Sequence, residues 1–195
     1  MIVYVLLGDA KMLKRTIATA AVFGALALNA TSAWSEDTKD YGGTAADPIT
    51  KKECGDCHMA FAPIQLPGRS WRLIMSDLSN HFGEDASLDA DTVKHIEEYL
   101  VSKSMDEGGT MYGSMTYKRL IKSKTVKKLM KKQKKKPQDY TPIRITDLGW
   151  WKGAHSSKKY RTMLTGKATK TGANCVLCHK SAEKGAYEEF DNIPG

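Results

Sequence analysis

Long apolar runs are scarce in this chain of 195 residues. The apolar stretch 16–28 is too short to span a bilayer comfortably, and no later segment is more apolar. It follows the basic pair Lys14 and Arg15 and precedes the small residues 31–33, which is the order found in a secretory signal peptide. We therefore expect residues 1–33 to be a signal peptide cleaved near Ala33, and the mature protein to be soluble and periplasmic. The alternative is a retained membrane anchor.

Alternating strand patterns and internal repeats are also missing, apart from one cysteine motif described below. Apolar residues recur instead at helical spacing, so we predict a mainly α-helical fold. The expected elements are a helix that begins at Asp47-Pro48, a helix capped by Ser70 that runs to Phe82, a helix that begins at Asp89 or Asp91, a loop at 105–115, a basic helix within 117–136 that Pro137 stops, and a helical region from Thr146 to Leu164.

Acidic residues become rare after residue 117. Residues 34–117 hold 15 acidic and 7 basic side chains, a net charge of −8, whereas residues 118–195 hold 6 acidic and 20 basic ones, a net charge of +14. Eleven of the basic residues fall within 118–136. Such a run is usually a solvated connector; the alternative is a docking patch for an acidic partner or an anionic membrane surface. We do not expect an exported protein to bind nucleic acid.

The change of charge at 117/118 and the second helical region after Pro142 predict an amino-terminal lobe (34–117), a basic linker or helix (118–141) and a carboxyl-terminal lobe (142–195).

Cysteine is limited to four residues, all of which lie in two copies of one motif: CGDCH at 54–58 and CVLCH at 175–179. Cys-x-x-Cys-His is the attachment sequence of c-type haem. Two cysteines three residues apart can each form a thioether to one porphyrin, and the following histidine binds the iron. We predict two covalently bound haems held by Cys54, Cys57, Cys175 and Cys178, with His58 and His179 as the proximal iron ligands.

Three other uses of these cysteines explain the pattern less well. A disulfide framework does not account for a histidine after each pair. A zinc site would have to join pairs that lie 117 residues apart, far more than in a zinc ribbon. A thiol-disulfide active site normally lies in a βαβ context, which the sequence lacks.

Three further histidines could bind iron from the distal side. His81 shares the apolar stripe of its predicted helix and is the best candidate for the first haem, although it could instead be a core histidine. His95 lies off the apolar stripe of the next helix, and we expect it at the surface.

The second haem needs a distal ligand from upstream, because only 16 residues follow His179. His155 lies 20 residues before Cys175 and beside two tryptophans, and Met163 is its rival. Crossed ligation, with His81 serving the second haem, stays open.

The segment WRLIMSDLSNHFGEDASL at 71–88, the preceding ECGDCH and the closing NCVLCHKSAEKGAYEEFDNIPG resemble the dihaem cytochrome c family of proteobacteria. The resemblance extends from about residue 52 to residue 195 and is weakest at 118–136. It implies a lobe like class I cytochrome c, followed by a smaller helical haem lobe. It also implies histidines on both faces of both irons, carried over to His58, His81, His155 and His179. Family members donate electrons to an oxygen-binding monohaem cytochrome c, often alongside a membrane cytochrome b.

Two imidazole ligands on each iron would leave no open position for a substrate, which favours outer-sphere electron transfer over catalysis. We therefore expect a one-electron carrier without catalytic residues, monomeric, at most peripherally attached to a membrane, and donating electrons to another cytochrome. The alternative is a dihaem enzyme or gas sensor with one open haem, for example one that reduces peroxide.

The motifs predict that the mature protein holds two haems and no titratable thiol, because all four cysteine sulfurs would be thioethers. Intact-mass measurement, a haem-stained denaturing gel and thiol titration of the unfolded protein check this. Free thiols in the unfolded protein would contradict double attachment.

Overall fold

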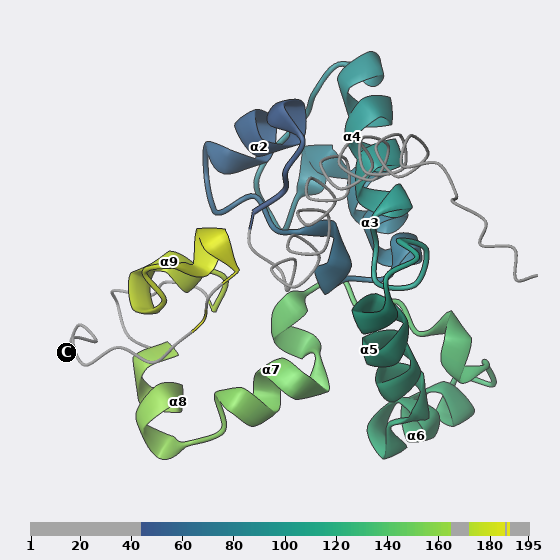
Figure 1. Cartoon of the computed structure of the whole chain (residues 1–195). Helices are drawn as coiled ribbons and strands as arrows, with labels where there is room; N and C mark the ends of the chain where they lie inside the picture. The colour runs from purple at the N-terminus through teal and green to yellow at the C-terminus, as the bar shows by residue number, and fades with distance from the viewer. Residues whose placement is uncertain (1–43, 165–171, 186, 188–195) are drawn as a thin grey trace, which may run out of the picture. The chain divides into compact units, whose positions relative to one another are not determined.

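Helices joined by irregular segments make up the structure, a computed structural model that describes residues 44–164, 172–185 and 187 (Figure 1). These residues form eight α-helices and five short 3-10 helices, and their β pairing is limited to two isolated bridges. The prediction of a mainly α-helical fold is confirmed. Within the described ranges, no helix is long and apolar enough to cross a membrane. The predicted signal peptide, 1–33, lies outside them.

Helix α2 (Pro48–Gly55) leads into the first cysteine motif. The Asp47 carboxylate accepts a hydrogen bond of 2.8 Å from the backbone N–H three residues further on, and Pro48 occupies the first helical position. This start agrees with the prediction. Cys54 lies in the last turn of α2, so the rest of the motif follows directly from a capped helix.

Helices α3 (Gly68–Met75) and α4 (Ala90–Ser102) pack against each other and form the main core (Figure 1). Asp89 caps α4 by accepting a hydrogen bond from the backbone N–H of Thr92. The helix was predicted to begin at Asp89 or Asp91, and Asp89 is the observed cap. The indole N–H of Trp71 donates to a backbone carbonyl at 2.7 Å, which satisfies its one polar atom inside the core. The buried cluster consists of Leu66, Trp71, Met75, Ile96, Leu100, Val101, Met105 and Leu148.

The predicted helix from Ser70 to Phe82 begins slightly earlier than expected and ends well before Phe82. It begins at Gly68, because Pro67 takes the cap position, and Ser70 is buried inside the helix. A Cβ at Gly68 would meet the carboxylate end of Glu107 at 2.5 Å, so a larger residue there would have to displace that side chain. The helix ends at Met75, and a 3-10 turn, η2 (Leu78–Asn80), precedes His81. Serine, aspartate and asparagine in this stretch compete with helical hydrogen bonding, which explains the early end.

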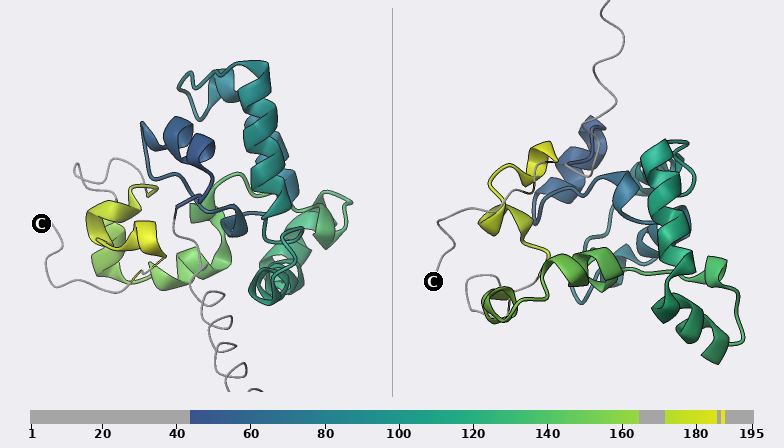
Figure 2. Two further views of the ribbon diagram at one scale, coloured as in Figure 1. Left: turned by 45° about the horizontal axis from the view of Figure 1, so that its top comes forward. Right: turned by 60° about the horizontal axis from the view of Figure 1, so that its bottom comes forward.

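Two helices, α5 (Met111–Lys122) and α6 (Lys124–Lys132), replace the loop expected at 105–115 and the single basic helix expected within 117–136. Thr110 caps α5, which the sequence analysis missed. Ser123 ends α5 and caps α6 with its hydroxyl group. The basic stretch therefore folds as a pair of contacting helices, and Figure 2 gives two further views of this part of the chain.

The expected break at Pro137 comes earlier in the structure. Helix α6 ends at Lys132, Lys134 adopts a left-handed φ of 55°, and Pro137 opens the short η3 (Pro137–Asp139). Helix α5 continues across the boundary predicted at 117/118, and the division into lobes stays a prediction.

The carboxyl-terminal part consists of short helices. They begin with the 3-10 helix η4 (Ile145–Asp147), continue with α7 (Gly149–Ala154), α8 (Lys158–Leu164) and α9 (Cys175–Cys178), and end with η5 (Ala182–Lys184). The remaining 3-10 helix, η1 (Pro63–Gln65), lies in the first half of the chain. The helical region predicted from Thr146 to Leu164 is thus broken after Ala154, where the chain leaves helical geometry at His155.

Ile96→Ala tests the α3–α4 core. Ile96 has no solvent exposure, and we expect its truncation to lower the free energy of unfolding by about 2–5 kcal/mol through lost burial and a residual cavity. Leu73→Ala on α3 is the control, because Leu73 is 50% exposed and should change stability by no more than about 0.5 kcal/mol. Guanidinium denaturation of the two holoproteins measures both. Equal effects would contradict this description of the core.

Candidate functional site

The first cysteine motif places its two thiols at the end of α2. Cys54 is half-buried and Cys57 is exposed. Burial, followed by the nearby negative charge of Glu53, raises the pKa of the Cys54 thiol to about 11. The thiol is therefore neutral near pH 7.

His58, which follows these cysteines, faces His81 across a gap (the N-terminal site). The two ring centroids are 6.1 Å apart and the ring planes differ by 18°. An imidazole nitrogen binds a first-row metal at about 2.0 Å and lies about 1.1 Å from its ring centre, so two trans imidazoles place their centroids about 6.2 Å apart. The gap between His58 and His81 therefore matches the space that one metal ion and its two axial bonds occupy.

Hydrogen bonding leaves the correct nitrogen of His58 available. Its Nδ1 lies 2.8 Å from the backbone carbonyl of Met59, and because a carbonyl only accepts, Nδ1 must carry the proton. Nε2 then keeps its lone pair for a metal, with the carbonyl holding the ring orientation. Burial, followed by the charge of His58, lowers the pKa of His81, which favours the neutral, metal-binding form.

A strained turn holds His81 in place. The backbone N–H of His81 donates to the carbonyl of Glu84 at 2.8 Å, while Phe82 between them has a φ of 57°, which is rare for an aromatic residue. Arg144 lies over the Phe82 ring, 4.2 Å from its centroid, and the Phe82 ring meets His81 edge-on with centroids 4.8 Å apart. A cation–π contact from a distant segment therefore supports the turn that carries His81.

The second motif forms a similar arrangement, the C-terminal site. Cys175 and Cys178 lie on α9, and burial raises the pKa of the Cys175 thiol to about 11. His179, directly after α9, lies 6.1 Å from His155 between ring centroids, with the planes at 88°. This separation again matches two trans imidazoles on one metal.

His155 is oriented by the helix that precedes it. Its Nδ1 donates to the carbonyl of Trp151 at 2.8 Å, so in the neutral ring the lone pair lies on Nε2, and the Trp151 indole stacks on the ring at 4.2 Å. Because His155 is the C-cap residue of α7, the end of that helix directs the imidazole toward His179.

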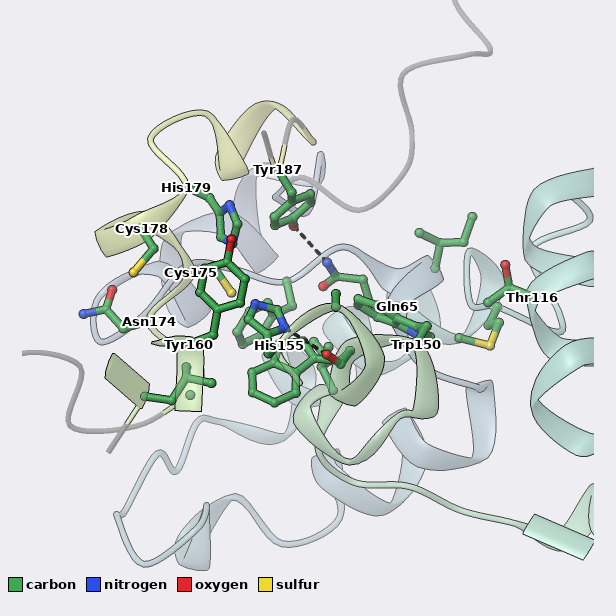
Figure 3. Close-up of a pocket in the computed structure, with 18 of the residues that line it drawn as sticks. Gln65, Thr116, Trp150, His155, Tyr160, Asn174, Cys175, Cys178, His179 and Tyr187 are labelled. Atoms are coloured by element: carbon green, nitrogen blue, oxygen red, sulfur yellow. Dashed lines mark hydrogen bonds between the residues drawn. The ribbon is translucent and has the colours of Figure 1, made fainter. Parts of the chain in front are cut away.

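A cavity of about 380 Å³ surrounds the C-terminal site (Figure 3), within the range of about 300–1,000 Å³ that is usual for cofactor pockets. Its walls are largely apolar and include both sulfurs and both imidazoles. Met163, the rival distal ligand, also lines it. The other walls include Ile64, Met105, Ile145, Trp150, Trp151, Tyr160 and Leu164. The residues present therefore fit a flat, apolar group that is anchored through sulfur and ligated by imidazole.

Residues 61–65 connect the two sites. Phe61 stacks on His58 with centroids 5.1 Å apart and also lines the cavity of the C-terminal site. The Gln65 amide donates to the Tyr187 hydroxyl at 3.0 Å (Figure 3), and the Tyr187 ring lies 5.5 Å from His179. One short segment of the first half thus contacts one histidine of the N-terminal site and the wall of the other site.

His95 lies outside both sites, as predicted. Its side chain is 45% exposed, and Nε2 lies 3.1 Å from the Asp47 carboxylate. The described residues contain no group of three or more potential metal-binding side chains of the kind that a four-cysteine zinc site would need.

Together, the helical fold and two Cys-x-x-Cys-His motifs, each facing a second histidine, define the class of c-type cytochromes. The family model for dihaem cytochrome c matches residues 50–187. A diheme cytochrome c from Rhodobacter sphaeroides is 37% identical with a TM-score of 0.57, covering 73% of this chain and 97% of that chain. A diheme cytochrome c from Shewanella baltica is 30% identical with a TM-score of 0.52, covering 76% of this chain and 93% of that chain. No curated protein matches.

The chain therefore belongs to the dihaem cytochrome c family. As a member, it holds two covalently bound c-type haems and has a role in haem-based electron transfer.

Sequence analysis missed the residues that position the histidines. Phe61 could have been noticed, because it is an aromatic residue three positions after His58. The contact of Arg144 with Phe82 and that of Gln65 with Tyr187 join positions far apart in the sequence, and no local pattern indicates them.

His81→Ala and His155→Ala should each convert one of the two haems from low spin to high spin, because each removes one imidazole of a facing pair. His95→Ala is the matched control and should leave both haems low spin. Optical and electron paramagnetic resonance spectra of the oxidised proteins measure the outcome. A spectral change in His95→Ala, or its absence in His155→Ala, would contradict the ligand assignment.

Proposed function

We propose that this protein is a periplasmic one-electron carrier in which His58 and His81 hold one haem iron, and His155 and His179 hold the other. The observation that carries the proposal is the equal centroid separation of 6.1 Å in both imidazole pairs, which is about the separation of two imidazoles bound to opposite sides of one metal.

Each haem, when bound, supplies reversible one-electron chemistry at its iron. The chain's own residues keep that chemistry limited to electron exchange. The paired imidazoles would hold each iron from both sides, and the backbone carbonyls of Met59 and Trp151 hold the rings of His58 and His155 in place. The apolar walls of the C-terminal site exclude water from the group that they enclose.

Outer-sphere transfer is the mode that this arrangement supports. A metal whose axial ligands are fixed before and after electron transfer needs little rearrangement, and no position is left for a substrate. The alternative, an enzyme or gas sensor with one open haem, requires one axial side without a strong ligand. A second imidazole at 6.1 Å in each site disfavours it.

Export to the periplasm rests on the signal-like sequence at 1–33. We further propose that the monomer exchanges electrons with other redox proteins and donates them to another cytochrome. The family resemblance suggests an oxygen-binding monohaem cytochrome c as the acceptor, and a membrane cytochrome b as a further partner.

Carbon monoxide distinguishes a carrier from an enzyme or sensor. The reduced protein at pH 7 should keep its low-spin spectrum under carbon monoxide, because both axial positions of each iron hold an imidazole. His155→Ala, treated in the same way, should bind one equivalent and serves as the positive control. Prompt binding by the unaltered protein would overturn the proposed function in favour of an open haem.

A further inference from the structure

Helices α5 and α6 carry a dense basic surface. The eleven lysine and arginine side chains within 118–136 are all exposed, and no acidic residue lies among them. None of the eleven forms an ion pair within the described part of the chain. We call this surface the basic face; it consists of Lys118, Arg119, Lys122, Lys124, Lys127, Lys128, Lys131, Lys132, Lys134, Lys135 and Lys136.

The charge pattern of α6 works against its own helix. Lys124 and Lys128, and likewise Lys128 and Lys132, are four residues apart, a spacing at which like charges repel and destabilise a helix. The apolar side of α6, formed by Val126 and Met130, is already buried and does not require this much charge to stay soluble. A connector alone would be more stable with mixed charges, so the pattern indicates a use outside the fold.

The basic face begins next to the wall of the C-terminal site. Tyr112 and Thr116 on α5 line the cavity that holds His155 and His179. On the exposed side of the same helix, Met111 is 79% exposed and Met115 is 45% exposed. Lys118 and Lys122 follow at helical spacing, so α5 presents an apolar patch at the cavity and a cationic strip one turn further on.

We propose that this surface, the exposed side of α5 together with α6, docks an acidic redox protein and that electrons cross at the C-terminal site. Methionine, tyrosine and arginine are enriched in protein interfaces, with apolar contacts at the centre and charges at the rim. The apolar patch lies nearest the cavity, where a short path for the electron is needed, while the lysines steer an acidic partner toward it. One electron leaves the protein and reduces the partner by one electron, and no bond forms or breaks. This inference rests on the proposed function, whose partner surface it names.

An anionic membrane fits this surface less well. A membrane-bound amphipathic helix inserts its apolar face into the interface. In α6, Val126 and Met130 face the protein interior, and Leu129 is the one apolar side chain that is exposed. We therefore commit to a protein partner.

Charge reversal near the cavity tests the proposal. The double variant Lys118→Glu, Lys122→Glu is compared with Lys51→Glu, Lys103→Glu, which changes the net charge equally at exposed positions on α2 and after α4. Stopped-flow oxidation of each reduced holoprotein by an acidic monohaem cytochrome c of higher potential measures electron transfer. Calorimetric titration of the two oxidised proteins measures binding.

At low ionic strength we expect the first variant to react about tenfold or more slowly and to bind about tenfold more weakly, with the control within about twofold of the unaltered protein. The difference should vanish at high salt, and a basic monohaem cytochrome c should not show it. Equal effects of the two variants, or rates independent of salt, would overturn the docking surface. A membrane result would also overturn it. In that case the unaltered protein binds phosphatidylglycerol vesicles tightly, the variant Lys118→Glu, Lys122→Glu does not bind them, and this variant still reacts with the acidic cytochrome at the unaltered rate.

Oxidation by an uncharged quinone separates this inference from the proposed function. All three reduced proteins should react with the quinone at the same rate, because no charge steers it. If the unaltered protein reacts with neither the quinone nor either of the two cytochromes, the carrier function itself is wrong. If it reacts with all of them but the two variants do not differ, only the docking surface is wrong.

Discussion

The distance between facing imidazoles is the constraint on which the rest of this protein depends. Each pair combines one histidine fixed by its cysteine motif with one brought from a distant segment, and the fold must hold both rings at 6.1 Å. A much shorter gap would not admit a metal ion between the two rings, and a much longer one would put it out of reach of one imidazole. The capped α2, the turn at His81 and the end of α7 are local solutions to this one requirement.

The two sites meet this requirement by different means. In the N-terminal site, His81 depends on a strained turn that Phe82 and Arg144 support, and strain of this kind persists only where surrounding contacts determine the conformation. In the C-terminal site, His155 is directed by a helix end and by stacking on Trp151. The ring planes are accordingly near-parallel in one pair and near-perpendicular in the other. The two sites therefore differ in the relative orientation of their imidazoles.

Chemistry that is tied to residue type and spacing was predictable from the sequence, whereas geometry that depends on distant contacts was not. Cys54 and Cys175 begin motifs whose spacing leaves little choice of cofactor, and this indicated the family. Asp47 predicted a helix start because a cap is a local interaction. The early end of α3 at Met75 and the support of Phe82 by Arg144 could not be predicted, because local turn conformations and contacts across 62 positions leave no periodic pattern.

The two parts of the chain that differ in net charge each carry one of the two facing histidine pairs. Residues 34–117, whose net charge is negative, include the histidines of the N-terminal site. Residues 118–195, whose net charge is positive, include those of the C-terminal site. The acidic partner proposed above would be attracted to the second part and repelled by the first. Phe61 contacts His58 and also lines the C-terminal cavity, so one side chain touches both sites. On the proposed carrier function, two haems held by parts of opposite net charge would let electrons enter and leave the protein at separate places.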